Sequence, residues 1–291
     1  MNHVGFGQSS FALNSLGLGL RLSTPVASGP KLQADFTTGT YTASGVTKTF
    51  TDLFTFNRAG KAWLVKDTGL QEYEADVPRI DDGLLIEQSA TNYLSWSALQ
   101  GTDVQNYPSS GMIVPSDDTI LKTGEMYTYT RGYNVHSYKS HPKTGLNADI
   151  YVSRTDKQEV VLGRTTSDVN GYFTAVDDST IKSKYNPATG LTVVSALLAS
   201  TSGSLGLVKY SGQDLPDADL RSHAMQVTDD DYSSSLIVTS TVPVTRPADF
   251  LINKITGTTV TGDWDSTLTL SIVNGQLVHS GYGRIRSLEI N

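Results

Sequence analysis

The sequence contains no cysteine among its 291 residues. This absence excludes a disulfide framework, a zinc site built on cysteine and a thiol nucleophile. Charged residues are few, at 18% of the chain, and aspartate plus glutamate (29) outnumber lysine plus arginine (22). The resulting net charge of −7 gives no basic field that would attract a phosphate backbone, so we expect no nucleic-acid partner.

The chain also lacks long apolar runs. No window reaches the roughly 18 consecutive apolar residues that a membrane-spanning helix requires, so no membrane insertion is expected. Residues 1–30 have neither the cationic start nor the apolar centre of a signal peptide. We therefore expect synthesis in the cytoplasm without a targeting signal.

Strand-like runs recur along most of the chain and predict an all-β fold. Runs rich in β-branched and aromatic residues are separated by glycine, asparagine, aspartate and proline, and no stretch has a convincing helical period. Short strands at this spacing indicate an antiparallel sandwich or jelly roll. The clearest local signal is Asn274-Gly275 between LTLSIV and QLVHS, which predicts a β-hairpin over residues 267–280.

Two segments carry a resemblance to a known class of protein. The first contains Phe56-Asn57-Arg58-Ala59, Pro78-Arg79-Ile80-Asp81, Gly83-Leu84-Leu85-Ile86-Glu87 and Thr91-Asn92, and the second is Val244-Thr245-Arg246-Pro247-Ala248-Asp249. In this order they resemble a module of tailed-bacteriophage tail and other virion proteins that carry a lectin-like β-sandwich. The departures from the usual pattern are Ile80 for Phe, Tyr93 for Leu and Pro247 for Ala.

The resemblance implies three parts. Residues 1–33, with leucines alternating from Leu16 to Leu22, are interpreted as an arm for virion attachment, the alternative being a flexible leader. Residues 34–95 are expected to form a small β-rich adapter. Residues 96–291 are expected to form a sandwich of the concanavalin A-like or laminin-G-like type, closed by the strand GRIRSLEIN.

The function implied is structural: a phage tail-tip or tail-fibre component that contributes to recognition of host-surface glycans. The resemblance further implies a homotrimer, other virion proteins as partners, and a place in the virion after synthesis in the host cytoplasm. Two alternatives stay open, a capsid decoration or connector protein and a polysaccharide-degrading tailspike.

Several charged residues of the module are interpreted as structural. Arg58 and Arg79 are expected to pair with Asp81, Asp82 or Glu87 beneath the short buried strand at 83–87. The full set assigned to the structural motif is Arg58, Arg79, Asp81, Glu87, Asn92, Arg246 and Asp249.

No catalytic or metal-binding motif stands out, and we expect neither an enzyme nor a cofactor. The five histidines form no helical i, i+4 pair and no His-x-His pair, so no transition metal is expected. Acidic clusters at Asp214, Asp217 and Asp219 and at residues 229–231 are interpreted as solvated loops, with calcium as the alternative.

A tyrosine-rich run is the best sequence candidate for a ligand site. Tyr127, Tyr129 and Tyr133 share one strand face if no bulge intervenes, and aromatic faces stack on sugar rings. The alternative is that these tyrosines pack one sheet face. With the neighbouring polar side chains, the candidate glycan platform comprises Tyr127, Tyr129, Arg131, Tyr133, Asn134 and His136.

Overall fold

The computed structural model describes residues 29–94, 97, 107–108, 113–117, 120–121, 125–129, 134–135, 144–163, 171–173, 175–199, 205, 207–209, 220–230, 232–240 and 242–291. Among these residues every strand pairing is antiparallel. Within the described ranges, helix is confined to α1 (Phe50–Leu53) and the short 3-10 turn η1 (Asp178–Thr180). The predicted all-β fold is confirmed.

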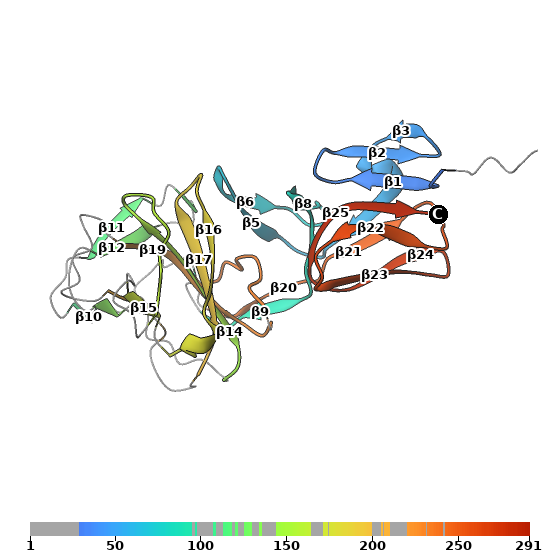
Figure 1. Ribbon diagram of the computed structural model, residues 1–291. Coiled ribbons are helices and arrows are strands. Elements are labelled where there is room, and N and C mark those ends of the chain that lie inside the picture. The colour runs from blue at the N-terminus through green and yellow to red at the C-terminus, as the bar shows by residue number, and fades with distance from the viewer. Residues whose placement is uncertain are drawn as a thin grey trace, which may run out of the picture.

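One sheet gathers strands from both ends of the described chain (Figure 1). Its members are β3 (Val46–Lys48), β2 (Thr40–Ala43), β1 (Leu32–Asp35), β25 (Gly283–Ile290), β8 (Gly83–Ile86), β7 (Ile80–Asp81) and β22 (Val260–Trp264). Strand β25 holds them together, because it pairs with β1, β8 and β22.

Two more strand pairs complete this part of the molecule. They are β4 (Phe54–Asn57) with β21 (Phe250–Asn253), and β23 (Leu268–Val273) with β24 (Gln276–Gly281). The second pair confirms the hairpin predicted over residues 267–280. Asn274 and Gly275 have φ values of 51° and 81°, the positive values that a type I′ turn requires.

These strands bury one common apolar core, and we call them the terminal unit. The core includes Leu32 and Phe36 from the beginning of the described chain, Leu84 and Ile86 from β8, and Leu288 near its end. Gly83 is needed for the close approach of β8 to β25. It has a φ of +108°, and a Cβ there would lie 2.8 Å from the backbone oxygen of Ile285.

The central unit is built around a second, eight-stranded sheet. Its members are β11 (Ile113–Asp117), β12 (Glu125–Tyr129), β19 (Leu220–Thr228), β14 (Asn147–Arg154), β17 (Leu191–Leu197), β16 (Lys182–Asn186), β9 (Ala90–Asn92) and β20 (Val244–Arg246). Two short pairs accompany it: β10 (Tyr107–Pro108) with β13 (Asn134–Val135), and β15 (Gly171–Phe173) with β18 (Leu207–Lys209).

The central sheet is covered on both faces. Ala148, Ile150 and Val152 of β14 enter one apolar core, whereas Tyr151, which alternates with them, enters another. The second core also receives Leu70 from the hairpin formed by β5 (Ala62–Lys66) and β6 (Gly69–Tyr73).

This β5–β6 hairpin lies between the two units in Figure 1. Trp63 and Val65 pack on the central core with Tyr151, while Leu64 packs with Leu85 of the terminal sheet. One face of β5 therefore packs on the central unit, and the opposite face packs on the terminal unit.

The sheet pairing runs across the predicted division at residue 95. Strands β1, β8 and β25 belong to one sheet, although the prediction placed β1 and β8 in an adapter and β25 in a separate sandwich. The predicted closing strand GRIRSLEIN does form a strand, but it closes the terminal unit. Residues 1–28 of the predicted arm lie outside the described residues. Within the described part of the chain, no helix is long and apolar enough to cross a membrane.

Candidate functional site

A buried ionic cluster forms where the terminal and central units meet. Arg79 precedes β7 and lies between two carboxylates, with Nη1 2.6 Å from Glu87 Oε2 and Nη2 2.5 Å from Asp249 Oδ2. Arg58 Nη1 lies 3.3 Å from the other oxygen of Asp249. All four side chains are at most 4% exposed. Buried charges of this kind are tolerated only when they are paired and hydrogen-bonded.

The central unit contributes directly to this cluster. Ser235 donates from its backbone N to Glu87 Oε1 (2.7 Å) and from its hydroxyl to Glu87 Oε2 (2.6 Å). Arg246 of β20 places Nη1 3.1 Å from Glu87 Oε2. Burial alone would raise the pKa of Glu87, but Arg246 and Arg79 outweigh it and lower the pKa to about 2. Glu87 is therefore held ionised at the junction.

Asn92 of β9 forms hydrogen bonds that connect the first strand of the central sheet to its neighbours. Its Nδ2 donates to the backbone oxygen of Ile237 (2.8 Å), and its Oδ1 accepts from the backbone N of Leu94 and of Val227, both at 3.1 Å. The side chain is fully buried. Asn92 thus ties β9 to β19 and to the segment 232–240.

Asp81 of the predicted structural motif lies apart from the ionic cluster. It is exposed, as is Asp82, and among the described residues neither pairs with Arg58 or Arg79. Of the partners predicted for the two arginines, only Glu87 is used. The prediction missed Asp249 as the shared partner, because its 170-residue separation from Arg79 leaves no local spacing signal.

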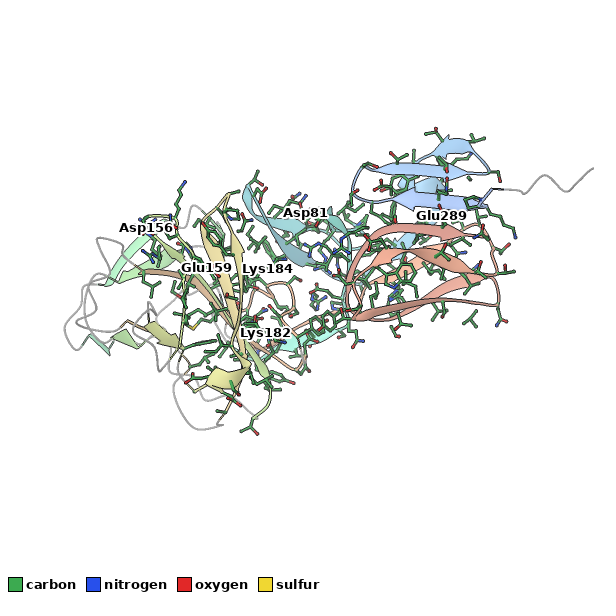
Figure 2. The ribbon with its side chains drawn as sticks, viewed as in Figure 1. Asp81, Asp156, Glu159, Lys182, Lys184 and Glu289 are labelled. Atoms are coloured by element: carbon green, nitrogen blue, oxygen red, sulfur yellow. The ribbon has the colours of Figure 1, made fainter. Side chains whose placement is uncertain are left out.

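A groove with a volume of about 1120 Å³ opens beside the cluster, between the two units. One wall is β16 of the central sheet, with Lys182, Lys184 and Tyr185. The facing wall comes from the terminal unit and includes Asp81 and Arg284. Figure 2 shows Lys182 and Lys184 on the central sheet and Asp81 nearer the terminal unit. The segment 232–236 and Glu87 also line the groove.

The charges of the groove are unevenly paired. Arg286 Nη2 lies 2.7 Å from Asp265 Oδ1, and Asp265 Oδ2 also accepts from the backbone N of Arg284. Lys184, in contrast, has a lowered pKa, because partial burial and the positive charge of Arg284 outweigh the nearby carboxylates, which include Asp265. Lys184 therefore loses its proton at a lower pH than an exposed lysine does.

Two stacked tyrosines lie in the groove and join the units. The rings of Tyr232 and Tyr282 have centroids 3.3 Å apart at an interplanar angle of 10°. The hydroxyl of Tyr232 accepts from the backbone N of Gln88 at 3.3 Å, and burial raises its pKa. Ligand-binding sites commonly combine aromatic side chains with a few hydroxyl or charged groups, and this groove contains both kinds.

The predicted tyrosine platform is only partly covered by the described residues. Tyr127 and Tyr129 lie in β12, which pairs with β11 and β19, and Asn134 lies in β13. The other three members, Arg131, Tyr133 and His136, lie outside the described residues. The strand over 127–129 is confirmed at the level of the backbone, and the platform itself stays a prediction.

One buried pair was not anticipated from the sequence. Ser153 Oγ and His223 Nε2 lie 2.8 Å apart on adjacent strands, beside the β-bulge between β14 and β19. The pairing of serine and histidine is typical of nucleophilic catalysis. Here the two residues are only 1% and 0% exposed, so a substrate has no access to them. We interpret the pair as a buried hydrogen bond between β14 and β19.

Among the described residues, no group of three or more histidine, aspartate or glutamate side chains is arranged to hold a metal ion. The acidic positions 214, 217 and 219 lie outside those residues. Comparison of the chain with family models, with curated proteins and with solved structures found no match.

Proposed function

We propose that this chain is a bacteriophage virion structural protein, of the tail tip or tail fibre, that contributes to recognition of glycans on the host surface. The observation that carries the proposal is the buried ionic cluster. Arg58, Arg79, Glu87 and Asp249 belong to the segments that resemble phage virion proteins, and they contact one another although up to 191 residues separate them. Residues of the two resembling segments contact one another in the fold. This contact favours a shared structural module as the origin of the resemblance and disfavours chance.

The central unit supports the lectin-like part of the proposal. One face of its antiparallel sheet packs on an extensive apolar core, as each sheet of a β-sandwich does. A groove with tyrosines and charged side chains runs beside it. Under the proposal, the N-terminal arm attaches the protein to other virion proteins, and a homotrimer multiplies weak sugar contacts into useful avidity.

The direct test is binding of the purified, fluorescently labelled full chain to candidate host cells, before and after mild periodate oxidation of their surface glycans. Saturable binding that oxidation removes would support receptor recognition. A folded, oligomeric protein that binds isolated capsids and no cells would instead favour a decoration or connector protein. Release of reducing sugar from host polysaccharide would favour the tailspike alternative.

A further inference from the structure

Three cationic side chains of the groove between the units have no ion-pair partner in the part of the chain that the structure describes. Among the described residues, Lys182, Lys184 and Arg284 form no ion pair, and Arg284 Nε is buried without a hydrogen-bond partner. Arg286, on the same strand as Arg284, is by contrast engaged with Asp263 and Asp265. A guanidinium N–H that is buried without an acceptor is costly.

Two of the cations that line the groove come from different units. Lys184 belongs to β16 of the central sheet, and Arg284 belongs to β25 of the terminal sheet. Arg284 is close enough for its charge to lower the pKa of Lys184, even though Asp265, Asp81 and Asp82 act in the opposite direction. An anion between Lys184 and Arg284 would offset this repulsion and favour the charged form of Lys184.

The rest of the groove suits a larger ligand than a free ion. Its volume of about 1120 Å³ slightly exceeds the roughly 300–1,000 Å³ of sites for drug-sized ligands, so an extended organic ligand would fit. Tyr282 is half-buried, and its ring is stacked on Tyr232. Exposed acids Asp81 and Asp82 add hydrogen-bond acceptors for hydroxyl groups.

We propose that this groove binds an acidic glycan, with an anionic substituent of one sugar held between Lys184 and Arg284 and the chain extending along Tyr282. This inference rests on the proposed function and adds to it the site and the charge of the ligand. The anionic group is a carboxylate or a phosphate, both of which an arginine fork binds with two hydrogen bonds. Because Lys184 and Arg284 come from different units, ligand binding would also fasten the units together.

The test is equilibrium binding of the full chain to immobilised oligosaccharides in three sets. The first set carries carboxylates and includes oligogalacturonate, the second carries phosphate groups, and the third is neutral and includes carboxyl-reduced oligogalacturonate. We expect binding to the carboxylated or to the phosphorylated set, which identifies the source of the anion. We also expect the affinity to fall as NaCl rises, because charges in an open groove are screened.

Single substitutions in the groove test whether Lys184 and Arg284 contact the ligand. Lys184→Gln and Arg284→Gln are each expected to weaken binding by about tenfold, as the loss of a hydrogen bond to a charged group does. Lys184→Arg should restore most of the affinity. Lys48→Gln is the matched control, because Lys48 is an exposed lysine of β3 in the terminal sheet and does not line the groove.

Three results would overturn the inference. The first is binding to the neutral set alone, and the second is acidic binding that Lys184→Gln and Arg284→Gln leave unchanged. The third is a protein that binds no set but still binds host cells in a periodate-sensitive way, and in that case the proposed function stands. Absence of both glycan and cell binding would remove the proposed function together with the inference.

Discussion

The two β units differ in how completely their strands are buried. Strands of the terminal unit alternate between buried and exposed residues, as in β1 and β23. In the central unit, β14 and β19 are buried along nearly their whole length and include Asp149, Gln226 and His223. The terminal unit therefore keeps one face of its strands in solvent. The central sheet buries both faces, and one of them is partly polar.

The polar face of the central sheet positions the segment that lines the groove. Gln226 Nε2 donates to Asp149 Oδ2 (2.8 Å) and to the backbone oxygen of Ser234 (3.1 Å), while Gln226 Oε1 accepts from the backbone N of Ile237 (2.9 Å). These bonds fix the segment 232–240, which carries Ser235 to the ionic cluster. An apolar face would bury as much area but would not set the position of this segment.

The ionic cluster is expected to give the largest effect of any single substitution. Asp249→Asn removes the carboxylate shared by Arg58 and Arg79 and leaves two buried guanidinium groups with too little negative charge. We expect the free energy of unfolding to fall by about 3–5 kcal/mol in urea denaturation. Lys61→Gln, which breaks exposed pairs with Glu72 and Glu74, should leave the free energy of unfolding nearly unchanged. Equal losses would contradict the distinction between the buried and the exposed pairs.

Core substitutions test whether the two units unfold together. Leu288→Ala in the terminal core and Ile150→Ala in the central core each remove a fully buried side chain, and each should destabilise by about 2–5 kcal/mol. Because the junction is buried and charged, we expect one transition by circular dichroism that shifts as a whole in both variants. A second transition that either substitution leaves in place would show that the units are independent.

Burial of Asp230 in the central unit predicts a specific dependence on pH. Desolvation raises its pKa to about 7, so the folded chain binds a proton that the unfolded chain releases near pH 4. The contribution of Asp230 to stability is therefore full below about pH 4 and is lost as pH rises to about 7. Asp230→Asn should remove this loss and, at pH 8, stabilise the protein by about 2 kcal/mol relative to the wild type. A variant whose stability changes with pH between 4 and 7 as the wild type does would contradict this account.

The smallest effect is expected in the terminal hairpin. Gly275 has a φ of +81°, and a Cβ there would lie 3.2 Å from Cβ of Thr256. Gly275→Ala should therefore cost about 1 kcal/mol, measured as a modest fall in melting temperature. Val278→Ala is the matched control, because Val278 is an exposed residue of β24 and should be nearly neutral.

Local signals in the sequence predicted the parts of the fold that depend on neighbouring residues. The strand alternation and the Asn274-Gly275 turn are signals of this kind, and both are confirmed. The pairing of β25 with β1 and β8 has no local signal in the sequence. The register between strands so far apart along the chain, such as Leu32 opposite Ile290, depends on tertiary packing. The resemblance placed Arg58, Arg79 and Asp249 in one structural motif, but it did not predict that the two arginines share Asp249 as a partner. That pairing and the groove beside it depend on the three-dimensional arrangement.

The measurement that tests the central claim most directly is amide hydrogen exchange on the full chain, wild type against Asp249→Asn. The cluster ties β8 of the terminal unit to Ser235 of the central unit through Glu87. We predict faster exchange in both the 79–87 and the 232–240 segments of the variant, with Lys61→Gln unchanged in both. Faster exchange confined to the terminal unit would contradict the claim that this cluster joins the two units.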